Sequence, residues 1–236
     1  TAATITYRGV TLTGVRGRAA IAGRIVRVSV EGFRAGGGRG AGNLQVDLTA
    51  SPPRVVVDAQ LNGAALAPLA NRLPPALDKI RGTYSAAGHY EMVGLTAGEI
   101  SSSIHGHASL LLRGVSFAEF DLLGALARAQ GKTPEPSRTD PVLRSASFVV
   151  RVEDRRVTLA ESPVVIGGIP LRISGVYEFG GMADVRIAPE VRRAASPWTL
   201  ASGDPSLSLE ANPIHLSGPL DRLALVRPAE AVRQAP

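Results

Sequence analysis

Apolar and polar residues alternate with a period of two along most of the chain. In the segment 26–31 valine alternates with Arg27, Ser29 and Glu31, and the segments 44–49, 55–61, 100–112 and 148–152 show the same pattern. Successive side chains of a strand point to opposite faces of its sheet, so this period is typical of a half-buried strand. Gly-rich or Pro-containing turns separate the runs. The pattern predicts a mainly β protein, with a predominantly antiparallel sheet of roughly a dozen strands.

Two segments depart from this alternation and predict short helical insertions. Between residues 61 and 80, leucines recur at helical spacing, and prolines divide the run into short pieces. The segment from Ser116 to Glu119 has the form of a capping box, which supplies partners for the free amides of a first helical turn. It opens an apolar stripe that ends at Gly131.

The pattern is consistent with one β domain over residues 1–227. Residues 131–141 are polar and proline-rich, which predicts a flexible loop, and residues 228–236 carry no core pattern and are expected to fray. No apolar run approaches the roughly 20 residues that a membrane-spanning helix needs. The chain begins at Thr1 without a leader-like segment, so we expect a longer protein whose N-terminal half and membrane anchor lie outside it.

The charge is positive and unevenly distributed. The chain carries a formal net charge of +6, and its first 40 residues hold seven arginines against a single acid, Glu31. A basic segment of this kind suits nucleic acid, anionic lipid headgroups or an acidic protein, and a solvated sheet face is an equally ordinary explanation. Aromatic residues make up only 4% of the chain and are not interleaved with the arginines, which argues against nucleic acid as a partner.

No motif in the sequence indicates an active site, a metal site or a cofactor. Gly131-Lys132-Thr133 resembles the end of a phosphate-binding loop, but Leu126 occupies the place of its first glycine. His105 and His107 share one strand face without a third ligand nearby in the sequence, and there is no cysteine. We therefore expect a protein that is not an enzyme, with no catalytic, metal-binding or cofactor-binding residues.

In their order along the chain, several segments resemble the C-terminal region of the AsmA family. The resemblance is carried by residues 7–15, the glycine hairpin with 42–48, the insert at 61–69, and the segments 80–85, 95–117 and 213–221. It implies a curled β sheet in a protein of the bacterial periplasm, tethered to the inner membrane. It also implies a part in outer-membrane biogenesis through contact with, or transport of, phospholipid along an apolar groove.

The alternation identifies which residues would take part in such a groove. The candidate lining residues are Val26, Val28, Val30, Ile100, Ile104, Leu110 and Leu112, and the candidate headgroup contacts are Arg8, Arg16, Arg18, Arg24 and Arg27. The main alternative is a solid-core module that docks on other envelope proteins through its sheet edges. A polysaccharide-acting hydrolase is a further alternative, and it would require paired carboxylates in a cleft.

Overall fold

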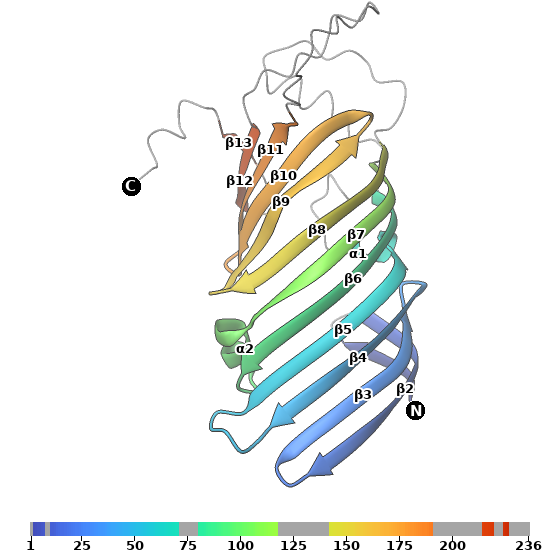
Figure 1. Ribbon diagram of the computed structural model, residues 1–236, viewed down its shortest axis with the longest axis vertical. Coiled ribbons are helices and arrows are strands. Elements are labelled where there is room, and N and C mark those ends of the chain that lie inside the picture. The colour runs from blue at the N-terminus through green and yellow to red at the C-terminus, as the bar shows by residue number, and fades with distance from the viewer. Residues whose placement is uncertain are drawn as a thin grey trace, which may run out of the picture.

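The computed structural model describes residues 2–7, 10–70, 80–117, 142–190, 214–219 and 224–226, and these residues form one antiparallel sheet. The strands are β1 (Ala2–Tyr7), β2 (Val10–Ala22), β3 (Ile25–Ala35), β4 (Gly38–Asp47), β5 (Arg54–Ala65), β6 (Ile80–Val93), β7 (His105–Phe117), β8 (Val142–Glu153), β9 (Arg156–Ile166), β10 (Ile169–Glu178), β11 (Met182–Pro189), β12 (Ile214–Pro219) and β13 (Ala224–Val226). The strands lie side by side in chain order, from β1 to β13 (Figure 1). The predicted mainly β, antiparallel architecture is confirmed.

Irregularities in the ladder recur at one end of the strands. The register shifts near the start of β2, the end of β3, the end of β5 and the start of β6, which all lie at the same side of an antiparallel sheet. Glycines with positive φ occupy several of these places, among them Gly63 and Gly82. A β-bulge locally bends its strand and increases the twist, and these irregularities lie along one end of the sheet.

The most buried residues gather beyond these bulges. Val115 and Ala64 have no exposed surface, and Leu143 is 3% exposed. The core cluster of buried residues comprises Leu66, Ile80, Val115, Leu143, Ala146, Phe148, Val164, Ile166 and Leu171. The solid core of the described residues thus lies at one end of β6 to β10, and most of the sheet extends away from it.

The helices differ from those predicted. The first predicted insertion, residues 61–80, begins with the last residues of β5, which end at Ala65. It then contains α1 (Ala67–Ala70), a single turn, and residues 71–79 lie outside the described residues. The described part of the second, Ser116 and Phe117, is the end of β7. The longest described helix is α2 (Ala97–Ser103), at neither predicted place.

The strand expected around residue 100 is therefore wrong, because residues 97–103 form α2 instead. The reason is a capping box at the start of α2, which the sequence analysis did not identify. The Glu99 amide donates to the Thr96 hydroxyl (3.3 Å), and the Glu99 carboxylate accepts from the Thr96 amide (3.0 Å). These bonds satisfy free amides of the first turn and outweigh the weak helix preference of the serine-rich segment that follows.

The predicted loop at 131–141 and the predicted frayed tail at 228–236 both lie outside the described residues.

Candidate functional site

The strand pairing sorts side chains of the sheet onto two faces of opposite character. Paired residues of an antiparallel sheet point to the same side, so a row of pairs can be followed from strand to strand. One such row is Val28, Leu44, Val57 and Tyr90, and its neighbour one residue along each strand is Ser29, Asn43, Asp58 and His89. We call the face that carries the first row the apolar face, and the other the polar face.

The apolar face is only half-buried over much of its extent. Eleven of its members on β3 to β8 retain intermediate exposure: Val26, Val28, Val30, Leu44, Val46, Val57, Leu61, Tyr90, Leu110, Leu112 and Val150. Four others are buried: Val55, Met92, Phe148 and Val152. All the described strands belong to one sheet, so the described residues contain no separate second sheet. Burial raises the pKa of the Tyr84 and Tyr90 phenols, which lie among these side chains.

A row of small residues crosses the apolar face between two rows of larger ones. Gly42, Ala59, Gly88 and Ala108 are paired in succession over four neighbouring strands. The row that contains Val28 lies on one side of them. The other side carries the row Leu61, Ala86, Leu110 and Phe148. Gly42 and Gly88 have no side chain and Ala59 and Ala108 have only a methyl group, and we call this row the furrow. The Tyr90 ring lies over part of it, since a Cβ at Gly88 would be 2.8 Å from Tyr90 Cε2.

The structure brings most of the predicted lining residues onto this face. Val26, Val28 and Val30 lie on β3, and Leu110 and Leu112 lie on β7. Ile100 belongs to α2 rather than to a strand, and Ile104 is the residue that caps the C-terminus of this helix.

The predicted arginines do not converge with that lining. Arg18 and Arg27 project from the polar face, where Arg18 forms an ion pair with Glu31 (3.1 Å) and Arg27 donates a hydrogen bond to Gln45 (3.1 Å). Arg16 is an exposed residue of β2, and Arg24 lies in the turn between β2 and β3. Arg8 lies outside the described residues. The sheet thus separates Arg18 and Arg27 from the valines that alternate with them.

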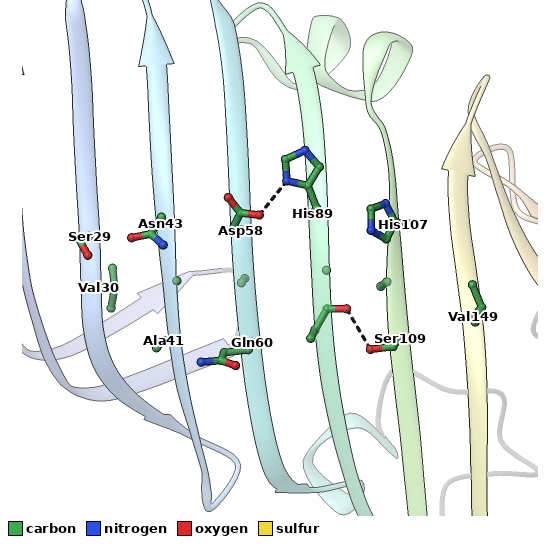
Figure 2. A pocket seen from close by; sticks show the side chains of 15 residues that line it. Ser29, Val30, Ala41, Asn43, Asp58, Gln60, His89, His107, Ser109 and Val149 are labelled. Atoms are coloured by element: carbon green, nitrogen blue, oxygen red, sulfur yellow. Dashed lines mark hydrogen bonds and ion pairs between the residues drawn. The ribbon is translucent and has the colours of Figure 1, made fainter.

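The polar face contains a cavity of about 680 Å³ over β3 to β8. Figure 2 shows two lines of side chains on neighbouring strands, one of them Ser29, Asn43, Asp58, His89 and His107. The other is Ala41, Gln60, Ala87, Ser109 and Val149. The backbone of the small-residue row lies between the two lines and forms the floor.

His89 connects two carboxylates at this site. Its Nδ1 donates to Asp58 Oδ1 (2.7 Å), and its Nε2 lies 3.5 Å from Glu91 Oε1. Ionised carboxylates only accept hydrogen bonds, so two such partners favour the imidazolium with both nitrogens protonated. The bond to Asp58, followed by the bond to Glu91, accordingly raises the pKa of His89.

Glu91 is held as an anion by its other partner. The Arg54 guanidinium bonds to its carboxylate, and this bond, with the one to His89, lowers the pKa of Glu91. A carboxyl group with a lowered pKa is unsuited to act as a general acid, which in glycoside hydrolysis needs a raised pKa. The arrangement is an exposed network of charges.

The sequence predicted that His105 and His107 share a face, and both lie exposed on the polar face. The rings of His89 and His107 are 6.0 Å apart between centroids. Across the described ranges, no group of three or more His, Cys, Asp or Glu side chains is placed to hold a metal ion.

The alternation puts Asn43, Asp58 and His89 on a polar face but cannot show that they meet, because their contact depends on the register between strands.

No described helix has the length and apolar character needed to cross a membrane. Comparisons with protein-family models, with curated protein sequences and with solved structures found no match for this chain.

Proposed function

We propose that this chain is a non-catalytic part of a bacterial envelope protein of the AsmA-like type, and that its apolar face contacts or carries phospholipid during outer-membrane biogenesis. The observation that carries the proposal is the half-exposed aliphatic surface on β3 to β8. Complete burial of a Val or Leu side chain gains about 1.5–3 kcal/mol. The side chains of this face are only partly buried, so a bound acyl chain would bury them further and stabilise the complex.

The furrow of small residues supports an acyl chain as the occupant. From β4 to β7 there are three strand spacings of about 4.8 Å, which gives a furrow of about 14 Å. One leaflet of a bilayer core is about 15 Å thick, half of the roughly 30 Å of the whole core. The furrow is therefore about as long as an extended acyl chain that spans one leaflet, and such a chain would lie perpendicular to the strands.

We propose in addition that the sheet curls toward its apolar face. The bulges at one end of β2, β3, β5 and β6 support this, because each bulge bends its strand. A bend in this sense would bring the bulky rows on either side of Gly88 closer together and deepen the furrow.

We propose fewer headgroup-contacting arginines than the sequence predicted. Arg18 and Arg27 point away from the apolar face, whereas Arg24 lies in a turn at the margin of the sheet. A cation at that margin would meet a headgroup whose acyl chain lies on the apolar face, and each basic residue near an anionic surface contributes about 1 kcal/mol.

The protein that contains this chain would then reside in the periplasm, tethered to the inner membrane, and would act with other envelope proteins. The second candidate function is a solid-core module that docks on such proteins. The buried cluster around Val115 and Leu171 favours this alternative, because that end of the sheet is packed rather than open.

The test is to purify the protein, extract it with organic solvent and count phospholipid per chain by mass spectrometry. Val56 and Val57 provide a matched pair, since these adjacent valines lie on opposite faces of β5. We expect near-stoichiometric phospholipid in the unaltered protein, its loss in V57D, and its retention in V56D. Circular dichroism of both variants checks that the sheet persists.

A folded protein without phospholipid would overturn the proposal in favour of the docking module. Equal lipid loss in folded V56D and V57D would also overturn it, because the lipid would then not distinguish the two faces.

A further inference from the structure

The polar-face cavity has the size of a ligand site. Its volume of about 680 Å³ lies within the roughly 300–1,000 Å³ of small-molecule sites in proteins. The side chains around it come from six neighbouring strands, β3 to β8, and are held by the backbone ladder (Figure 2). This cavity is on the opposite side of the sheet from the furrow, so it does not belong to the proposed lipid surface.

The lining combines donors and acceptors in the same side chains. Its polar members are Ser29, Asn43, Asp58, Gln60, His107 and Ser109, together with His89. The hydroxyls and amides among them both donate and accept hydrogen bonds. A ligand rich in hydroxyl groups matches this mixture, because each of its hydroxyls also donates and accepts.

The charge in the cavity is compensated internally. Asp58 is the only carboxylate among the lining residues, and it is bonded to His89 (2.7 Å). Because Asp58 Oδ1 is already bonded to the His89 ring, neither group is free to pair with a charged ligand. An uncharged ligand needs no such partner.

The spacing and the small residues favour an extended ligand with apolar patches. Polar groups on adjacent strands repeat every 4.8 Å or so, along a line from Ser29 to His107. Ala41 and Ala87 leave space in the second line, and Val149 adds an exposed apolar contact. Sugar rings present hydroxyls at their edges and C–H groups on their faces, which suits both features.

We infer that the polar face binds an uncharged oligosaccharide, laid across β4 to β7 in this cavity. Hydrogen bonds from Asn43 and Gln60 would hold successive sugar rings, and the alanines would leave room for the ring faces. The sheet would then contact lipid on one face and glycan on the other.

The experiment is a titration of the isotope-labelled chain with maltohexaose, cellohexaose and chitohexaose, followed by NMR. We expect at least one glycan to bind with a Kd of about 1 mM or tighter, and to shift the side-chain amide signals of Asn43 and Gln60. Q60A should weaken binding roughly 3- to 10-fold, the usual effect of one lost hydrogen bond. A87L, which fills the cavity at an exposed position, should abolish it.

T158A is the matched control. Thr158 belongs to the same row of the polar face through its pairing with Arg151, but it lies outside the cavity. Binding by none of the three glycans would overturn the inference. So would equal weakening in T158A, signal changes confined to the apolar face, or tighter binding of inorganic phosphate or an extended peptide to the same amides. The lipid count is measured separately, so the two proposals fail independently.

Discussion

His89 illustrates how residue-scale chemistry arises from pairing between distant segments. Its two ring nitrogens face Asp58 on β5 and Glu91 on its own strand, and Asp58 is 31 residues away in the chain. Nothing in the local sequence around His89 indicates this contact. The alternation predicts only that these side chains are polar and share a face.

The raised pKa of His89 predicts a pH-dependent contribution to stability. The free energy contributed by the imidazolium is fully present below the unfolded-state pKa of about 6.5 and is lost as pH rises through the higher folded-state value. D58N removes the largest cause of the shift, so NMR titration should give a lower pKa for His89 in this variant. The stability lost by D58N, measured by urea unfolding, should be greater at pH 6 than at pH 8. D184N, in the same row of the polar face, should leave the His89 titration unchanged, and an unchanged pKa in D58N would contradict the assignment.

Gly82 predicts a second residue-scale effect, from backbone geometry. Its φ is +122°, and a Cβ at this position would lie 2.9 Å from the Gly114 carbonyl oxygen and from the Val115 Cα. G82A should therefore destabilise the protein by more than about 1 kcal/mol. G98A in α2, where a Cβ meets nothing within 4 Å, should stabilise it by about 0.5–1 kcal/mol. Urea unfolding measures both, and a neutral G82A would show that the bulge beside it tolerates a side chain.

At the scale of elements, the strands follow their local pattern and the helices do not. The segments with sustained alternation form strands, and the glycines at 36 and 37 form the tight turn between β3 and β4 that the glycine cluster favours. At Thr96 a four-residue cap starts α2 within a segment whose serines and isoleucines also fit an alternating strand. Helix and strand patterns are hard to separate over so few residues.

The cap of α2 gives the element-scale prediction. T96A removes the hydroxyl that accepts from the Glu99 amide, and it should cost about 0.5–2 kcal/mol of stability. S102A, in the same helix, loses only a bond from its hydroxyl to the Glu99 carbonyl and replaces serine with the best helix former. It should be neutral or slightly stabilising in the same thermal or urea unfolding experiment. Similar losses in both variants would show that the cap does not hold this helix.

At the scale of the whole molecule, the protein combines a packed end with an open sheet. Leu143 lies in the core cluster and is 3% exposed, whereas Leu44 lies half-buried on the apolar face. This contrast underlies the proposed lipid surface. A bound lipid would bury apolar side chains of the open face, whereas those of the packed end are already buried.

The two leucines predict how stability is distributed. L143A should cost about 2–5 kcal/mol, the usual range for a buried leucine, and L44A should cost clearly less because its site is already partly open to solvent. Chemical denaturation of the two variants measures the difference. Equal costs would contradict the open apolar face and favour a solid core throughout.

The sequence by itself determined the strands with sustained alternation, apart from the segment that forms α2, and which residues of one strand share a face, since both follow from the local period of two. It thereby grouped Val26, Val28 and Val30 on one face of their strand, and His105 and His107 on the face opposite Leu110 and Leu112 of theirs. Only the tertiary structure decided which residues of different strands meet: the Asp58–His89–Glu91 network, the furrow through Gly88 and the separation of Arg18 and Arg27 from the apolar lining. The physical reason is that alternation is a property of one strand, whereas register is a property of two, set by the turns, the bulges and the packing that each pair must satisfy together.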